Sequence, residues 1–299
     1  MKLLVIVLVL QAVLGLTLIA LVATDNLPFT DGEANGAVRP APTPVVDRFD
    51  GAAAWDLLVE QVELGPRPAG SEASRQLAAR LRELVPNGRY QPVPGGLQNV
   101  IGTVRGREPG YIVVGAHYDT KDLPGFVGAN DAASGTAVVA ELARTVKRPR
   151  HTIHFIFFDG EEAPRGVPDS EFERYGLRGS KVAARRFNDA RAMVLLDFVG
   201  DRRLRIPREA NSSAGLWRKL RAAAKRVGAA RIFPDVTEGV VSDDHVPFLR
   251  RGVPSIDLID FDFPCFHEPC DDLDVVSERS VDAVGETVLD LIRRLQAGR

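Results

Sequence analysis

Four short apolar runs, spaced along the chain between helical segments, limit what this sequence can fold into. They are residues 111–116, 153–158, 193–199 and 254–259. Most are separated by stretches with helical spacing, which are residues 134–146, 179–187, 213–227 and 277–295. Apolar runs of this length are typical of buried strands, and strands that alternate with helices predict an α/β layered fold with a largely parallel sheet.

Two further helical segments, residues 52–63 and 71–85, come before the first apolar run. Leu77, Leu81 and Leu84 fall on one face of the second segment. Ser71 is its expected N-cap, because a serine oxygen can accept a hydrogen bond from the first free N–H groups of a helix. The sequence between the two segments, LGPRPAGS, has the proline and glycine content of a loop.

Residues 1–23 differ from the rest of the chain. After Lys2, an apolar run extends from Leu3 to Ala23. A helix of that length rises about 30 Å, which is enough to cross the hydrocarbon core of a bilayer. A cleaved signal peptide has a shorter apolar stretch, and the sequence LVA before Thr24 is a poor cleavage site. The run therefore favours a retained signal anchor over a cleaved signal peptide.

The position of Lys2 predicts that the N-terminus stays in the cytoplasm and that the rest of the chain is exported. The domain is then anchored in the membrane by the N-terminal helix, with its folded part outside, or secreted if the signal is cleaved. Residues 24–47 are rich in Pro, Gly, Asp and Asn and predict an extended linker. Residues 48–299 remain as the globular domain.

Charge excludes one class of partner. The chain has 38 basic and 40 acidic side chains and a formal net charge of −2, so no global field favours nucleic acid. Short motifs exclude other chemistries: the sequence has no G-x-S-x-G, no H-E-x-x-H and no G-x-G-x-x-G after a strand.

Acidic and histidine residues stand where the apolar runs end. His117 follows the first run, Glu161 and Glu162 follow the second, Asp197 lies in the last part of the third, and His267 comes soon after the fourth. Ligands in such folds bind beyond the carboxyl ends of the strands, so we expect these side chains to meet at one edge of the sheet. Imidazole and carboxylate are the ligands of hydrolytic zinc sites, and the sequence therefore predicts a zinc enzyme.

The acidic candidates differ in the alternatives they leave open. Asp131, in GANDAASG, could bind a metal or bridge two metals, or it could only cap the helix that follows. Glu161 and Glu162 are adjacent at the mouth of an apolar strand, which is costly unless a cation neutralises them. One of the pair could be a ligand and the other a general base. Asp197 interrupts the apolar sequence MVLLDFVG, so it requires a metal or a shared proton.

The two candidate histidines have different surroundings in the sequence. His117 could bind a metal or simply end its strand, and Asp119 is expected to fix its tautomer as a carboxylate partner. His267 lies between Cys265 and Cys270, the two cysteines of the chain. Because the domain is predicted to be exported, we expect these cysteines to form a disulfide that closes a short loop around a ligand.

The motifs AHYDT, GANDAASG, FDGEEA, LLDFVG and SDDHVPFLRRGVP, taken in this order, resemble the superfamily of zinc aminopeptidases and glutaminyl-peptide cyclotransferases. The resemblance spans residues 60–295. It implies a three-layer αβα sandwich around a mixed, mostly parallel sheet. It also implies that the substrates are peptide or protein N-termini and that the cofactor is zinc, as one ion or as two.

In the aminopeptidase branch, the resemblance implies two zinc ions. Their ligands would be His117, Asp197, Glu162 and His267, with Asp131 bridging. Glu161 would then be the general base that activates a water molecule to attack the first peptide bond.

In the cyclase branch, the resemblance implies a single zinc ion held by Asp131, Glu162 and His267. Glu161 would carry a proton from the substrate's α-amine to the departing ammonia. Asp197 and Asp243 would form a buried, hydrogen-bonded pair of carboxylates beside the substrate.

Features of the sequence favour each branch. The doubled acid of Asp243 and Asp244 favours the cyclase, because aminopeptidases commonly carry a single acid before that histidine. GANDAASG and CFHEPCDD favour the aminopeptidase. Phe266 stands where animal cyclases have tryptophan, and it could stack on a substrate but cannot donate a hydrogen bond. We favour the cyclase. A third alternative, an inactive domain that binds a partner, is disfavoured because every ligand position and Glu161 are present.

Overall fold

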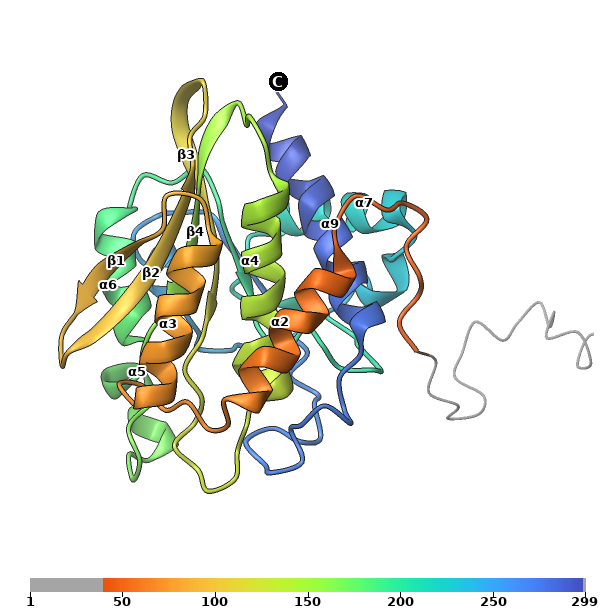
Figure 1. Ribbon diagram of the computed structural model, residues 1–299. Coiled ribbons are helices and arrows are strands. Elements are labelled where there is room, and N and C mark those ends of the chain that lie inside the picture. The colour runs from red at the N-terminus through yellow and green to blue at the C-terminus, as the bar shows by residue number, and fades with distance from the viewer. Residues whose placement is uncertain (1–39, 298–299) are drawn as a thin grey trace, which may run out of the picture. The chain divides into compact units, whose positions relative to one another are not determined.

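A six-stranded sheet runs through the centre of the structure, a computed structural model that describes residues 40–297 (Figure 1). Its strands stand in the order β1-β2-β4-β3-β5-β8. Their bounds are β1 Arg89–Val93, β2 Leu97–Val104, β3 Glu108–His117, β4 His151–Phe158, β5 Met193–Leu196 and β8 Ser255–Leu258. Strand β2 pairs antiparallel with both of its neighbours, whereas β4, β3, β5 and β8 pair parallel. The sheet is therefore mixed and mostly parallel, as predicted.

Helices cover both faces of this sheet (Figure 1). The longer helices are α2 Gly51–Glu63, α3 Glu72–Leu84, α4 Gly135–Thr145, α6 Arg178–Arg186, α7 Ala214–Val227 and α9 Glu278–Gln296. The short elements are the turns η1 Ala129–Ser134, η2 Asp169–Glu171 and η3 Ala230–Ile232, the helices α5 Phe172–Tyr175 and α8 Val246–Leu249, and the strand pair β6 Arg208–Glu209 and β7 Thr237–Glu238. Helices α3, α4, α7 and α9 lie over one face, with α2 packed on α4 and α9, while α6 and α8 lie over the other.

Alternation along the strands divides the apolar side chains between the two layers. On β3, Ile112 and Val114 face the larger core under α2, α3, α4, α7 and α9. Val113, between them, faces the smaller core under α6 and α8. Because both faces of the sheet are buried, the sequences of its strands are continuous apolar runs and do not alternate between apolar and polar residues. The three-layer αβα sandwich is thus confirmed.

The hairpin of β1 and β2 was missed by the sequence analysis, which expected four strands. Its sequence contains Pro92 on β1 and Pro94, Gly95 and Gly96 in the connection. Proline is tolerated here because β1 is the edge strand: on one side of its backbone the described part of the chain provides no partner strand. Gly95 and Gly96 have φ angles of 87° and 77°, which favour glycine in a tight turn. The proline and glycine residues of this segment indicated a loop, so the sequence did not predict the strand pair, which is stabilised by its pairing with the rest of the sheet.

The ends of the expected helices agree with the structure to within one residue, and Ser71 caps α3 by accepting a hydrogen bond from the Ser74 N–H. The last residues of the predicted linker pack on the domain: Ala41 is buried, and the Val45 N–H donates to the Val227 carbonyl at 2.9 Å. Among the helices of residues 40–297, none has the length and apolarity that a bilayer crossing needs. The anchor expected over residues 1–23 lies outside the described residues.

His154, inside β4, generates a prediction about stability. Burial, together with the charges of Arg89 and Arg186, lowers the pKa of His154 to about 4. The unfolded chain, with a histidine pKa of about 6.5, binds more protons between these two values. This contribution to stability is present above pH 6.5 and is lost as the pH falls toward 4. His154→Phe should therefore lose less stability than the wild type between pH 7 and pH 5, measured by urea unfolding at both pH values. Identical losses in the two proteins would contradict it.

Candidate active site

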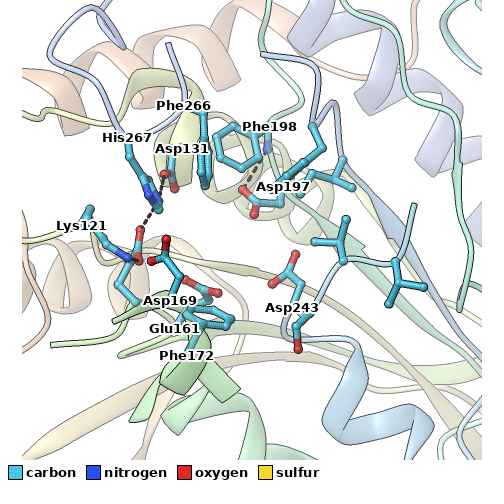
Figure 2. Close-up of a pocket in the computed structure, with 16 residues that line it drawn as sticks. Lys121, Asp131, Glu161, Asp169, Phe172, Asp197, Phe198, Asp243, Phe266 and His267 are labelled. Atoms are coloured by element: carbon cyan, nitrogen blue, oxygen red, sulfur yellow. Dashed lines mark hydrogen bonds and ion pairs between the residues drawn. The ribbon is translucent and has the colours of Figure 1, made fainter. Parts of the chain in front are cut away.

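The carboxyl ends of β3, β4, β5 and β8 bring the sequence-predicted residues together at one edge of the sheet. His117 is the last residue of β3, Glu161 and Glu162 follow β4, Asp197 directly follows β5, and His267 lies in the loop after β8. Figure 2 shows several of these side chains pointing into one pocket. All are buried except His267, whose side chain is 23% exposed.

Asp131 lies between the two histidines. Its Oδ1 is 3.3 Å from His117 Nε2, and its Oδ2 is 3.3 Å from His267 Nε2. His117 Nε2 also lies 3.4 Å from Asp197 Oδ1, and His267 Nε2 lies 3.0 Å from Glu162 Oε1. Two groups of possible metal ligands result, His117–Asp131–Asp197 and Asp131–Glu162–His267, and each has its donor atoms within 4.8 Å of one another. One carboxylate thus takes part in both groups.

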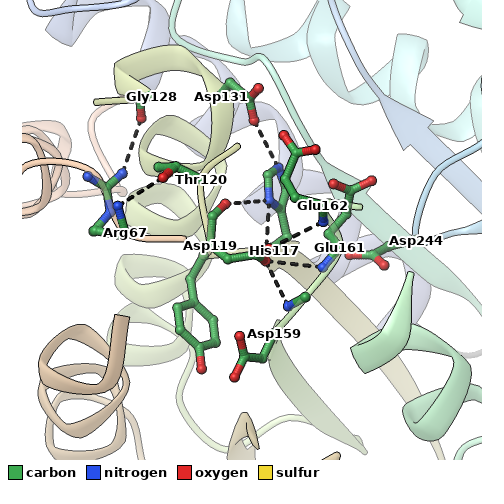
Figure 3. A network of polar contacts seen from close by, with 12 residues as sticks. Arg67, His117, Asp119, Thr120, Gly128, Asp131, Asp159, Glu161, Glu162 and Asp244 are labelled. Carbon is green, nitrogen blue, oxygen red and sulfur yellow. Dashed lines mark hydrogen bonds and ion pairs between the residues drawn. The ribbon is translucent and has the colours of Figure 1, made fainter. Parts of the chain in front are cut away.

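The backbone around Asp131 is fixed by remote residues. The Asp271 carboxylate accepts hydrogen bonds from the Asn130 and Asp131 N–H groups at 2.7 and 2.9 Å. Arg67, fully buried, donates to the Gly128 carbonyl (Figure 3). Asp131 does not cap α4. The N-cap residue of this helix is Ser134, whose side chain makes no capping hydrogen bond. The capping alternative is therefore wrong, and the side chain is free to face the histidines.

Asp119 acts differently from what the sequence suggested. His117 Nδ1 is bonded at 3.0 Å to the backbone carbonyl of Asp119, which leaves Nε2 directed toward Asp131 and Asp197. The Asp119 carboxylate instead accepts the backbone N–H groups of Gly160, Glu161 and Glu162 at 2.9, 3.1 and 3.2 Å (Figure 3). The carbonyl fixes the tautomer of the imidazole, and the carboxylate orients the paired glutamates.

A disulfide closes the loop that carries His267. Cys265 and Cys270 are bonded, as predicted, and Asp271 follows directly. The same short loop therefore presents one histidine to the pocket and the carboxylate that holds Asp131. His267 has a φ angle of 54°, in the left-handed region that costs a non-glycine residue about 1–3 kcal/mol.

The pocket between these loops has a volume of about 280 Å³. Its polar lining consists of Lys121, Asp131, Glu161, Glu162, Asp169, Asp197, Ser242, Asp243 and His267. Its apolar lining consists of Phe172, Phe198, Val240, Val241, Ile259, Phe261 and Phe266. Phe266 stacks on the His267 ring with a centroid distance of 3.9 Å, and both predicted substrate-side residues, Phe266 and Asp243, line the pocket. A space of this size holds a small ligand or one end of a chain.

Electrostatics show that the pocket needs positive charge. Burial raises the pKa of Glu161 well above its usual value, and the charge of Glu162 raises it further. Burial also raises the pKa of Asp197 to about 7, against the opposing effect of His117. Burial lowers the pKa of His267, but its contacts with Asp131 and Glu162 outweigh this effect and raise it to about 9. The crowded, buried carboxylates therefore favour a positive charge in the pocket.

The expected hydrogen bond between Asp197 and Asp243 is not formed among the described residues, although both line the pocket (Figure 2). Asp243 instead accepts the Asp244 N–H at 2.5 Å and lies against Asp257, on β8. Burial and the charge of Asp243 raise the pKa of Asp257 well above its usual value. Asp243, Asp257 and His245 form a third group of possible ligands, with donor atoms within 4.8 Å of one another. No hydrogen bond joins the two carboxyls among the described residues.

Behind this pair lies a buried histidine, His245, between two carboxylates. Its Nε2 is 3.3 Å from Glu209 Oε2, and its Nδ1 is 3.6 Å from Asp257 Oδ2. Glu209 also accepts the N–H groups of Asn211 and Ser212 at 2.9 and 2.7 Å. A chain of polar groups therefore runs from the pocket wall at Asp243 through Asp257 and His245 to Glu209.

Sequence reasoning missed four residues that support the site, namely Arg67, Glu209, Asp257 and Asp271. Asp257 could have been found, because it interrupts the apolar run PSIDLI just as Asp197 interrupts MVLLDFVG. The others lie in loops, at a sheet margin or in the linker between two helices, where charged residues are ordinary.

The donor set fits zinc. Each group combines imidazole nitrogen with carboxylate oxygen, the ligands that zinc accepts. Asp131 Oδ2 is buried and accepts no hydrogen bond within the described structure. A buried oxygen of this kind requires a partner for its lone pairs. A cation between the two histidines and the acids would supply that partner.

Comparisons with known proteins agree with this geometry. The sequence profile of peptidase family M28 matches residues 99–292. The glutaminyl-peptide cyclotransferase of Bos taurus is 32% identical over 58% of this chain and 59% of its own length. That of Drosophila melanogaster is 30% identical over 64% of each chain. The match thus spans less than two thirds of the length of these two relatives.

Two solved structures share the fold. A glutaminyl cyclase from an Acidobacteriales bacterium superposes with a TM-score of 0.72 at 29% identity, covering 89% of this chain and 99% of that one. A leucine aminopeptidase precursor from Bacteroides thetaiotaomicron has a TM-score of 0.72 at 28% identity, covering 83% and 98%. The fold is therefore common to proteins described as cyclases and as aminopeptidases.

The placement of His245 predicts a large loss of stability on its removal. His245→Ala removes the polar contacts that His245 makes with the buried carboxyls of Glu209 and Asp257, which costs about 1–3 kcal/mol for buried polar groups that lose a partner. Urea unfolding at a fixed zinc concentration measures the change. His154→Ala is the matched control, because His154 has no carboxylate partner among the described residues and should cost less. Equal losses for the two variants would show that His245 contributes only by packing.

Proposed function

This chain belongs to peptidase family M28, and on that premise we propose that it is a zinc-dependent glutaminyl-peptide cyclotransferase. It would convert an N-terminal glutamine into pyroglutamate and release ammonia. The observation that carries the proposal is the position of Asp243, the first acid of the doubled pair, in the wall of the pocket beside the metal-ligand groups. The cyclotransferases among its relatives support it.

The zinc ion would be held by Asp131, Glu162 and His267, whose donor atoms lie within 4.8 Å of one another. When bound, zinc supplies a Lewis acid that polarises the carbonyl of the glutamine side chain. Lys121 Nζ is 2.9 Å from Glu162 Oε2 and holds the second oxygen of that ligand. The disulfide loop and Asp271 fix the other two ligands in place.

Glu161 would carry the proton. The α-amine of the substrate attacks the side-chain carbonyl carbon, a C–N bond forms, and the bond from that carbon to the amide nitrogen breaks. Glu161 takes one proton from the attacking amine and gives it to the leaving nitrogen, which departs as ammonia. The buried position of Glu161 raises its pKa, which suits a group that both accepts and donates a proton.

Asp197, Asp243 and Phe266 would position the substrate. Asp243 and Asp197 face the pocket from different loops and can accept hydrogen bonds from the substrate's amine and backbone N–H (Figure 2). Phe266, stacked on His267, offers an aromatic face to the first residue. Holding amine and carbonyl at reacting distance supplies much of the rate enhancement, because both belong to one molecule.

An aminopeptidase is the second candidate, and a specific observation favours it. His117, Asp131 and Asp197 form a second group of donors, with Asp131 common to both groups, which is the arrangement that two metal ions require. In that case Glu161 would take a proton from the water that attacks the first peptide bond. Asp197 would be a ligand and not a substrate contact.

We also propose that the catalytic domain works outside the cytoplasm. The Cys265–Cys270 disulfide supports export, since disulfides persist in oxidising compartments. The apolar run over residues 1–23 would then be the anchor or the signal peptide.

The ligand assignment predicts metal content. Asp131→Ala should leave less than about one tenth of the zinc of the wild-type protein, because both donor groups lose their common carboxylate. Elemental analysis of protein purified in zinc-containing buffer measures it. Asp260→Ala, another buried acid that belongs to neither group, should keep its zinc. Undiminished zinc in Asp131→Ala would refute the assignment.

The reaction is tested with two peptides, one beginning with Gln and one with Leu, incubated with zinc-loaded protein and followed by mass spectrometry. We expect the Gln peptide to lose one ammonia while the Leu peptide stays intact. Glu161→Gln should keep its zinc but lower the rate by about 100- to 10,000-fold, as the loss of a general base does.

The same experiment separates the alternatives. Release of free Leu, with the Gln peptide not cyclised, would establish the aminopeptidase and refute the cyclase. Full activity in Glu161→Gln would refute the proton-transfer role under either chemistry.

A further inference from the structure

A second cavity adjoins the pocket and has no part in the chemistry described above. Its volume is about 520 Å³. It is lined by Pro207, Glu209, Glu238, Gly239, Val240, Val241, Ile259, Asp260, Phe261 and Asp262. Val240, Val241, Ile259 and Phe261 also line the first pocket, so the two cavities lie side by side along one shared wall, and together they are called the groove below.

The shared wall exposes large apolar side chains. Val240 is 71% exposed and Phe261 53%, and Phe266 beside them is 39% exposed. The rings of Phe261 and Phe266 lie 5.1 Å apart. Apolar side chains grouped at the mouth of a pocket mark a binding surface, because their exposure to water costs free energy that a ligand can recover.

This surface is held in place. The Ala210 N–H donates to the Gly239 carbonyl at 2.9 Å, and the Val241 N–H donates to the Glu209 carboxylate at 3.3 Å. Ser242 Oγ donates to Glu173 at 2.6 Å, which ties the segment to α5 across the pocket. Val240 is therefore exposed on a tethered segment and not at a free loop tip.

Beyond the apolar wall the cavity is acidic. Glu238, Asp260 and Asp262 line it, and within residues 40–297 the one basic side chain that bonds to this group is Arg205, which contacts Glu238 at 2.7 Å. The Asp260 carboxylate is buried and accepts the Arg205 N–H at 2.8 Å. Acid exceeds base in this part of the groove, so a cation is the complementary ligand.

We propose that the second cavity binds the substrate chain that follows the N-terminal residue, with a preference for a large apolar second residue and a basic third residue. This inference rests on the proposed function, because it places the first residue in the pocket beside Glu161 and Asp243. The chain leaves the pocket across Val240 and Phe261, where an apolar side chain fits. It then reaches the acidic part of the groove, where the side chain of a lysine or arginine can form ion pairs with Glu238 and Asp262.

The test uses peptides that differ only at these positions, with Phe or Gly second and Lys or Glu third, in one series that begins with Gln and another that begins with Leu. In the series that the enzyme turns over, we expect kcat/KM to be about tenfold higher for Phe than for Gly at the second position, since apolar contacts of this size discriminate by about 10- to 200-fold. The value of kcat/KM should be higher for Lys than for Glu at the third position, and a higher salt concentration should reduce that difference.

Variants assign these preferences to the groove. Phe261→Ser and Val240→Ser should remove the preference for Phe, and Asp262→Asn should weaken the preference for Lys. Val45→Ser is the matched control, because Val45 is 73% exposed and lines neither cavity. Rates that agree within twofold across the peptides, or preferences that survive in Phe261→Ser, would overturn the inference.

A binding measurement separates failure of this inference from failure of the proposed function. Fluorescence anisotropy of labelled pyroglutamyl peptides with zinc-loaded Glu161→Gln protein reports on the groove without turnover. If neither peptide series reacts, the proposed function fails, and binding alone decides the inference. Tighter binding of the Phe-Lys peptide that is lost in a Glu161→Gln/Phe261→Ser protein supports the groove, and equal binding of all peptides overturns it.

Discussion

The site depends on the position of one carboxylate, that of Asp131, between two imidazoles. Each of its oxygens lies 3.3 Å from a different histidine, so a shift of this side chain would change both donor groups at once. Its backbone is held by Asp271, and Arg67 holds the preceding turn at Gly128. The residue after it, Ala132, has a φ angle of 95°, a conformation that only a surrounding structure can impose. The loops at this edge of the sheet therefore hold the Asp131 carboxylate in a fixed position.

Sequence reasoning identified the fold where its pattern is local. Four buried strands and the six longer helices can be recognised from apolar runs and from helical spacing. A strand that is buried on both faces is a continuous apolar run, so its own sequence is enough to identify it. The β1–β2 hairpin contains too much proline and glycine to show any pattern. It is a strand pair because β2 bonds to β4 over residues distant in sequence, and such pairing cannot be read from a local window.

The same distinction applies to the site. His117, the paired glutamates and Asp197 stand at strand ends, so the fold itself predicts that they meet. Asp257, Glu209 and His245 form a contact chain that links β8, β6 and the start of α8, and its members become related only when the chain is folded. The resemblance paired Asp197 with Asp243, whereas the structure brings Asp243 and Asp257 into one group of donors. Sequence similarity identifies residues but not the side-chain rotations that bring them together.

The ligands alone do not separate cyclisation from peptide hydrolysis, since Glu161 and both donor groups serve either reaction. What differs is the source of the nucleophile, which is the substrate's own amine in one case and water in the other. Phe266 stacks on His267, and Phe198 and Phe261 pack edge to face beside it, so one side of the pocket is apolar. Such a cover reduces the access of water and strengthens the charges beneath it once a substrate is bound. A pocket of that kind suits an amine delivered by the substrate, so the apolar cover adds to the position of Asp243 as support for the proposed cyclisation.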